Sequence, residues 1–140
     1  MTDYKPWPMD VPDWSLVFHP KGYLIAILAD PDEGERALAT VEAAGYAPED
    51  VRVYSGEEIL DNHERCIASQ STVGKIVGAV TDDAEGRDAY LAYARDGRSA
   101  LWMRIPDEYG VPKALRTLAD HKALHIRYYG DKRQDDFHMA

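Results

Sequence analysis

Two segments of this 140-residue chain repeat the same order of strand, helix and strand. In 23–54, the apolar run YLIAILA precedes a helical pattern that starts at Asp30 and Pro31 and stops at Gly45, and the short strand VRVYSG follows. Asp as N-cap and Pro at the first helical position are typical of a helix start. In 100–129, the strand ALWMRI, a helical pattern and the strand LHIRYY recur in that order. Two such units interleave into a four-stranded antiparallel sheet with helices on one face, so the sequence predicts an α+β, ferredoxin-like fold.

The remaining stretches divide the chain into an arm, an insertion and a tail around one domain. Residues 1–22 contain four prolines among large aromatic residues, so we expect an extended arm packed on the domain. Residues 57–97 carry an apolar helical pattern interrupted by glycines and by a Ser/Thr cluster, which predicts a helical insertion between the two units. Residues 131–140 read as a polar tail. A chain of this length suits one core, so 23–130 is interpreted as a single domain.

Charge and cysteine content limit the partners and the compartment. The chain has 25 acidic and 16 basic residues and a net charge of −9, so it repels phosphate backbones and nucleic-acid binding is not expected. Cys66 is the only cysteine, which leaves no internal disulfide and favours a reducing cytoplasm. The charged, proline-rich start does not resemble a signal peptide, and the longest apolar stretch is too short to span a bilayer. We expect a cytoplasmic protein that does not bind membranes.

Several short segments resemble the heat-induced or general stress proteins of bacteria. They are the strand YLIAILAD, the helix start PDEGERALATVEAAGY, the strand VRVYSG and the long segment YLAYARDGRSALWMRIPDEYGVPKALRTLADHKALHIRYYG. Tyr90, Tyr93, Gly97 and the final strand match the tyrosine, glycine and strand order of that family. The resemblance covers about 23–130 and implies a ferredoxin-like core in a stress-associated protein, but it transfers no catalytic residues. The arm over 1–22 and the segment HERC at 63–66 depart from the family pattern.

Strand parity separates two faces of the expected sheet, because alternate side chains of a strand point to opposite faces. One parity is apolar and predicts the core under the two main helices; it contains Val51, Val53, Leu101, Met103, Ile105, Leu124, Ile126 and Tyr128. The other parity contains three arginines, three large aromatic residues and a histidine. Its members are Arg52, Tyr54, Trp102, Arg104, His125, Arg127 and Tyr129. We predict that this second face is a surface for a ligand or a partner.

Three interpretations of the second face remain open. In the first, the insertion or the arm covers it, with arginine stems over aromatic rings. In the second, it pairs with another copy of the chain, because Trp, Tyr and Arg are enriched at interfaces, and we therefore expect a homodimer. In the third, arginines and aromatic rings bind an anionic or aromatic small molecule. The placement of the insertion decides among them and has no local signal in the sequence.

No catalytic motif accompanies these residues. His63 and Cys66 stand three residues apart and share one face of a helix, but two ligands do not complete a zinc site, so no metal and no cofactor are expected. His125 would neighbour arginines on the sheet and is the better candidate acid or base. We expect a non-enzymatic, stress-associated domain that binds a protein or a small ligand. The alternative is a small dimeric α+β-barrel enzyme or a haem-binding protein that uses His63 or His125.

Overall fold

The computed structural model describes residues 21–68, 84–130 and 134–137. Nearly all of the predicted arm over 1–22 lies outside these residues, and so does the middle of the predicted insertion. The strands are β1 (Tyr23–Leu28), β2 (Val51–Tyr54), β3 (Ser99–Arg104), β4 (His125–Tyr129) and β5 (Gln134–Phe137). The α-helices are α1 (Pro31–Ala43), α2 (Gly56–Ala68), α4 (Ala84–Arg95) and α5 (Val111–Leu118), and short 3-10 turns are η2 (Pro48–Asp50), η3 (Glu108–Gly110) and η4 (Ala119–His121).

The sheet has the strand order β2-β3-β1-β4-β5, and every neighbouring pair is antiparallel. The first four strands stand in the order that two interleaved βαβ units produce, so the predicted α+β, ferredoxin-like fold is confirmed. The fifth strand adds an edge that the sequence does not indicate. Residues 131–140 read only as a polar tail, but β5 pairs with β4 over four positions. The segment QDDF has no apolar alternation, and its strand conformation comes from the backbone hydrogen bonds that the edge of β4 offers.

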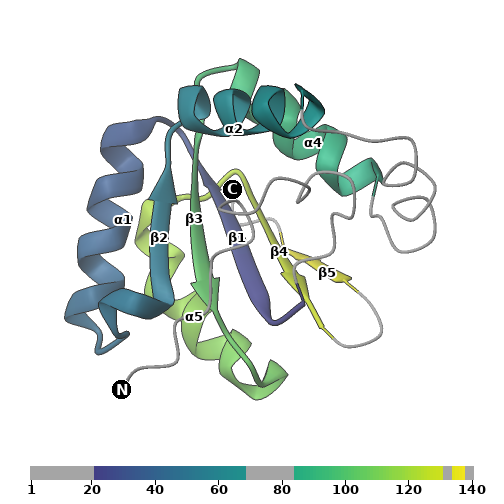
Figure 1. The fold of residues 1–140 in the computed structure, drawn as a ribbon. Helices are drawn as coiled ribbons and strands as arrows, with labels where there is room; N and C mark the ends of the chain where they lie inside the picture. The colour runs from purple at the N-terminus through teal and green to yellow at the C-terminus, as the bar shows by residue number, and fades with distance from the viewer. Residues whose placement is uncertain (1–20, 69–83, 131–133, 138–140) are drawn as a thin grey trace, which may run out of the picture.

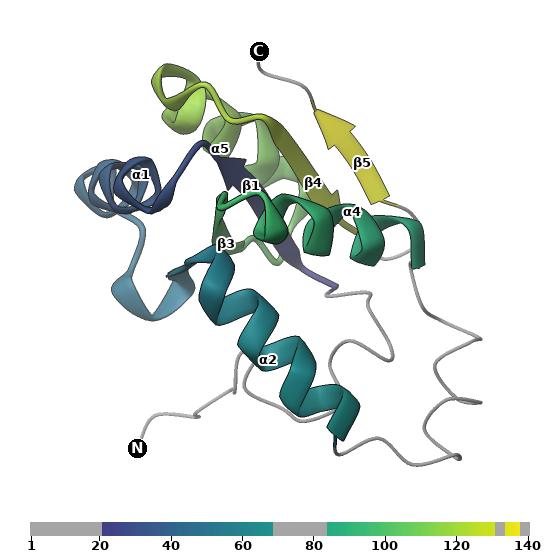
Figure 2. The same ribbon diagram turned by 90° about the horizontal axis from the view of Figure 1, so that it is seen from above.

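Helices cover both faces of the sheet (Figures 1 and 2). The helices of the two βαβ units, α1 and α5, lie on one face as predicted, and α2 and α4, the helices in the described part of the insertion, lie on the other. The buried residues accordingly form two clusters with the sheet between them. The first contains Leu24, Ala26, Leu28, Leu101, Met103, Ile126 and Tyr128 together with Ala37, Val41, Ala114 and Leu118 of the helices. The second contains Ile25, Ile27, Tyr54, Ala100, Trp102 and Tyr129 together with Ile59, Tyr90, Leu91 and Ala94.

The sequence predicts the start of the first helix correctly. The Asp30 carboxylate accepts a hydrogen bond of 2.8 Å from the backbone N–H of Glu33, and Pro31 occupies the first helical turn, as expected. The chain leaves the helix through Gly45, whose φ of +107° suits glycine. The start of the last strand differs from the prediction. Leu124 precedes β4 and packs against the second cluster, not the first.

Candidate functional site

The second face of the sheet is an interior surface. Trp102 has no exposed area, Tyr129 is 1% exposed and Tyr54 is 6% exposed. Tyr23, Tyr54 and Tyr90 meet the Trp102 ring edge to face at centroid distances of 5.7, 6.2 and 6.0 Å. The indole Nε1 of Trp102 donates a hydrogen bond of 3.0 Å to the Tyr90 hydroxyl. Of the three interpretations of this face, the structure shows the first, in which helices of the insertion cover the sheet. Trp102 is buried in the core between the sheet and these helices.

The arginines of this face lie at the rim of the covered surface. Arg104 donates to the Tyr23 hydroxyl at 2.9 Å and to the backbone carbonyl of Glu49 at 3.1 Å, with its guanidinium carbon 5.8 Å from the Tyr23 ring centroid. The guanidinium carbon of Arg127 lies 6.0 Å from the centroid of the Tyr129 ring. Arginine stems over aromatic rings are what the first interpretation predicts, because the stem is apolar while the guanidinium stays near water.

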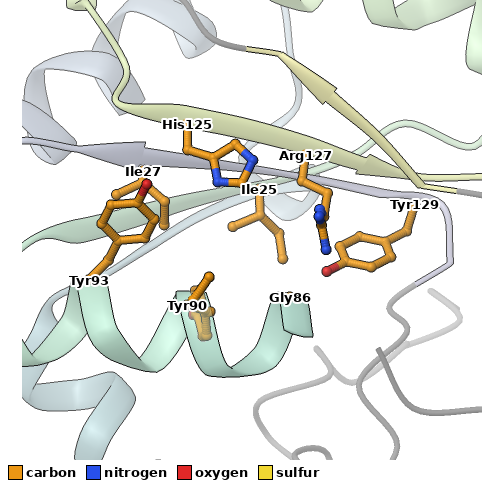
Figure 3. Close-up of a pocket in the computed structure, with 9 residues that line it drawn as sticks. Ile25, Ile27, Gly86, Tyr90, Tyr93, His125, Arg127 and Tyr129 are labelled. Atoms are coloured by element: carbon orange, nitrogen blue, oxygen red, sulfur yellow. The ribbon is translucent and has the colours of Figure 1, made fainter. Parts of the chain in front are cut away.

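A pocket opens beside this core, between β1, β4 and α4 (Figure 3). The side chains of His125, Arg127 and Tyr129 project from β4 toward α4. The full lining consists of Ile25, Ile27, Gly86, Ala89, Tyr90, Tyr93, His125, Arg127 and Tyr129. The empty space measures about 310 Å³ including open solvent at the mouth, but the centre of a water molecule can reach only about 20 Å³ of it. The pocket is therefore narrow in this conformation.

The chemical character of the pocket is apolar and aromatic with one cation. Ile25 and Ile27 are nearly fully buried, whereas His125 and Arg127 are half-buried. The His125 ring lies 6.2 Å from the Tyr93 ring at an angle of 58°. None of the nine described lining residues is an acid. The lining therefore combines aliphatic and aromatic walls with one guanidinium group and one imidazole ring.

A wider and more polar groove lies beside β2 and α2. Its lining consists of Arg52, Val53, Tyr54, Glu58, Asp61, Asn62 and Arg65, and its water-accessible volume is about 630 Å³. Arg52 donates a long hydrogen bond of 3.5 Å to the Tyr54 hydroxyl, and Arg65 forms an ion pair with Asp61 at 3.5 Å. The Arg65 and Asp61 side chains are about two-thirds exposed. Charges of both signs and ready access of water make this groove a solvated surface.

The seven residues predicted for the second face thus do not form one site. His125, Arg127 and Tyr129 line the pocket, Arg52 and Tyr54 line the groove, and Trp102 and Arg104 line neither. Sequence reasoning missed the residues that the first strand and the insertion contribute, namely Ile25, Ile27, Gly86, Ala89, Tyr90 and Tyr93. Parity marks the two isoleucines, and the spacing of the two tyrosines indicates one helical face. Neither signal reveals that α4 crosses β4.

His63 and Cys66 do not define a metal centre within the described structure. The Nδ1 atom of His63 is buried and has no hydrogen-bond partner among the described residues. Burial lowers the pKa of His63, and the nearby Arg87 and Arg95 lower it further, which favours the neutral ring. The side chain of Cys66 lies outside the described residues. Within the described ranges, no three His, Cys, Asp or Glu side chains are grouped to hold a metal ion.

A separate polar cluster joins α1 to η4 on the other layer of the molecule. His121 Nδ1 lies 2.6 Å from a carboxylate oxygen of Glu33, and His121 Nε2 lies 2.8 Å from the Thr40 hydroxyl oxygen. The order of carboxylate, imidazole and hydroxyl is that of a catalytic triad. However, the Thr40 hydroxyl donates to the backbone carbonyl of Arg36 at 3.1 Å, and none of the three residues lines either hollow described above. The cluster therefore links α1 to η4 by side-chain hydrogen bonds.

Comparison with family models, with curated proteins and with solved structures found no match for this chain. The resemblance to general stress proteins stays a prediction. The fold and the pocket define the protein as an α+β domain whose five-stranded antiparallel sheet is covered by helices on both faces, with a small pocket between the sheet and α4. Within the part of the chain that the structure describes, no helix is both long enough and apolar enough to cross a membrane.

Proposed function

We propose that this chain is a non-enzymatic domain that binds a small ligand in the pocket between β1, β4 and α4. The observation that supports the proposal is the presence of Arg127 and His125 in the lining of a pocket whose other walls are aliphatic and aromatic. Ligand sites in proteins combine apolar walls with a few polar groups that orient the bound molecule. The pocket meets that description, whereas the groove beside β2 is open and solvated.

The dimensions of the pocket restrict the ligand to a small one. The empty space of about 310 Å³ includes open solvent at the mouth, and the part that the centre of a water molecule can reach is only about 20 Å³. Because water reaches only a small part of this space, binding requires side chains at the mouth to move. Tyr93, His125 and Arg127 are half-buried, and changes of side-chain rotamer are common when ligands bind.

An acid–base role of His125 on the bound molecule is the alternative to simple binding, because His125 lines the pocket. The two functions differ in what happens to the ligand. For a binding domain, a bound compound is recovered chemically unchanged after long incubation with the protein, as measured by mass spectrometry. Conversion that depends on His125 would establish the enzyme instead.

Three further properties predicted from the sequence belong to the same proposal. The chain is expected to work in the cytoplasm, in a stress response, and as a homodimer. The homodimer is the most direct of these to test, because light scattering at micromolar concentration gives the mass in solution. A mass of one 15.7 kDa chain would remove the dimer from the proposal and leave the pocket unaffected.

A ligand screen with a pocket-filling variant tests the binding function. Ala89 lines the pocket on α4, whereas Ala92 of the same helix is exposed, so Ala89→Leu fills the pocket and Ala92→Leu is the matched control. We expect small anionic and aromatic compounds to raise the melting temperature of the wild type and of Ala92→Leu, but not of Ala89→Leu. A ligand that stabilises all three proteins equally would contradict the site, and a screen without any stabilising compound would contradict the function.

A further inference from the structure

We propose that His63 makes the contact between α2 and α4 sensitive to acid, because protonation of its imidazole ring weakens the packing of these two helices. The proposal does not depend on the ligand-binding function. His63 lies in the second half of α2, and α2 packs against α4 over the second face of the sheet. The side of α2 on which His63 lies, its buried ring nitrogen and the charges around it each support the proposal.

His63 continues the buried face of α2. Ile59 precedes it by four residues, is 1% exposed and belongs to the cluster that α2, α4 and the sheet share. Residues four apart lie on the same face of a helix, so His63 lies on the side of α2 that packs toward this cluster. Leu91 and Ala94 of α4 belong to the same cluster. A positive charge on His63 would therefore arise next to a closely packed, apolar contact.

The buried nitrogen of the His63 ring has no acceptor for an additional proton. Nδ1 is buried and makes no hydrogen bond within the part of the chain that the structure describes. A neutral imidazole tolerates this, because the tautomer with its proton on Nε2 leaves only a lone pair at Nδ1. In the protonated ring both nitrogens carry an N–H group, and an N–H that is buried without an acceptor is destabilising. Protonation is therefore opposed while α2 stays packed on α4.

The charged groups around His63 also oppose a positive ring. Arg87 and Arg95 of α4 repel the imidazolium, whereas Asp88 of α4 and Glu64 of α2 attract it. Burial lowers the pKa of His63 most, and the two arginines lower it further, which outweighs the two carboxylates. The Asp88 side chain is 74% exposed and lies 3.8 Å from the Arg87 side chain, so water and an arginine both weaken its effect on His63.

The stability of the fold is expected to fall as the pH drops below about 6.5, the ordinary pKa of a histidine. A histidine whose pKa is lower in the folded state binds fewer protons there than in the unfolded chain. The free energy of unfolding therefore falls as the pH drops from the unfolded-state pKa toward the folded-state pKa. The carboxyl group of Glu33 acts in a separate window below about pH 4.5. Measurements between these two values separate His63 from that carboxyl group.

Weakening of the contact reaches the sheet through α4. Tyr90 of α4 accepts the hydrogen bond of the Trp102 indole at 3.0 Å, and α4 also contributes Tyr93 to the pocket wall. Because α2 packs against α4, loosening of this contact in acid removes part of the support of that wall. Replacing Trp7 and Trp14 by Phe leaves Trp102 as the only tryptophan of the full chain, so its fluorescence reports the packing of α4.

Proton NMR of the histidine rings tests whether His63 resists protonation. The His63 signals are assigned by their absence from His63→Leu and His63→Gln, neither of which can be protonated at this position. We expect His63 of the wild type to titrate with a midpoint below 6.5. Arg95→Gln is expected to raise this midpoint, whereas Arg65→Gln, at an exposed position of α2, is expected to leave it unchanged. A midpoint of 6.5 or above in the wild type would overturn the proposal.

Urea unfolding and hydrogen exchange test the effect on the helices between about pH 8 and about pH 5. With falling pH, we expect the urea midpoint of Trp102 fluorescence to decrease. The backbone amides of α2 and α4 are expected to lose protection after correction for the intrinsic exchange rate. His63→Leu and His63→Gln are expected to show smaller losses than the parent protein, whereas His125→Leu, which removes another half-buried histidine, retains the full loss. Equal losses in the parent protein and in both His63 variants would overturn the proposal.

Discussion

The hydrogen bond between Trp102 and Tyr90 links the sheet to the insertion at the scale of single residues. Both side chains are buried, and the indole N–H reaches the Tyr90 hydroxyl at 3.0 Å. A buried N–H without a partner costs free energy, so this hydroxyl stabilises the position of α4 on the sheet. Burial also raises the pKa of Tyr90 well above its ordinary value, which keeps the hydroxyl protonated far into the alkaline range.

Replacing Tyr90 by Phe should therefore destabilise the protein. Phe keeps the ring but leaves the indole N–H of Trp102 buried and unpaired, which is expected to lower the free energy of unfolding by about 1–3 kcal/mol. Urea denaturation of the wild type and the variant measures this difference. Tyr93→Phe is the control, because Tyr93 is only partly buried. Equal stability of the two variants would show that the hydrogen bond contributes little.

The hydrogen bond between Glu33 and His121 predicts a dependence of stability on pH. The hydrogen bond from Arg36 lowers the pKa of Glu33 below its ordinary value of 4.5, and the hydrogen bond to His121 lowers it further. A carboxyl group whose pKa is lower in the folded state stabilises the fold above the unfolded-state pKa, and this stabilisation is lost as the pH falls through the folded-state pKa. The expected window therefore lies below about pH 4.5.

Substituting Glu33 by Gln should flatten the acid limb of the stability profile. Thermal unfolding of the wild type, Glu33→Gln and the exposed control Glu42→Gln, measured from neutral pH to below 4.5, tests this. We expect Glu33→Gln to be less stable than the wild type at neutral pH and to lose less stability on acidification. An acid limb that is unchanged in Glu33→Gln would assign the pH dependence to other groups.

At the scale of elements, the close approach of α2 to the end of α4 depends on Gly56. A Cβ atom at this position would lie 2.4 Å from the backbone carbonyl oxygen of Ala94 and 3.0 Å from that of Arg98. Backbone atoms cannot move away as a flexible side chain can. The start of α2 therefore needs glycine for reasons of packing, although glycine is a poor helix former.

Gly56→Ala is expected to lower the free energy of unfolding by about 1–3 kcal/mol, because the added methyl group overpacks the contact between the two helices. The opposite result, a gain of about 0.5–1 kcal/mol, is expected if helix propensity alone matters. Chemical denaturation distinguishes the two outcomes by sign. The neighbouring exposed residue offers a control in Glu57→Ala, which changes the same helical turn without the clash.

At the scale of the whole molecule, two clusters share one sheet. Strands β1 and β3 contribute alternate side chains to both, so Leu24 and Leu101 lie in the first cluster while Ile25 and Trp102 lie in the second. Neither layer of helices can leave without exposing a face of these central strands. This sharing couples the two layers energetically.

The coupling predicts a single cooperative unfolding transition. In the Trp7→Phe, Trp14→Phe background, Trp102 fluorescence reports the second cluster, and far-UV circular dichroism reports all helices and strands. We expect the two signals to give the same urea midpoint and the same slope, as in two-state unfolding. A separate, earlier fluorescence transition would show that α2 and α4 detach from the sheet before the rest unfolds.

The sequence alone determined most of the fold and part of the site. Strand parity, the Asp30 cap and the order of the two βαβ units predict the first four strands, the helices α1 and α5, and the face that His125, Arg127 and Tyr129 share. These features are local, because they follow from side-chain alternation and helix-start chemistry within a few residues. They also mark the second face as unlike an ordinary solvated surface.

Only the tertiary structure decided what lies on that face. The packing of α2 and α4 on the sheet buries Trp102, Tyr54 and Tyr129, and the crossing of α4 over β4 creates the pocket. The polar segment that forms β5 likewise carries no sequence pattern that indicates its pairing with β4. These features depend on contacts between residues far apart in the chain, and helix placement after a long connection leaves no periodic pattern in the sequence. Residue types are local, but the surfaces they form depend on which elements cover them.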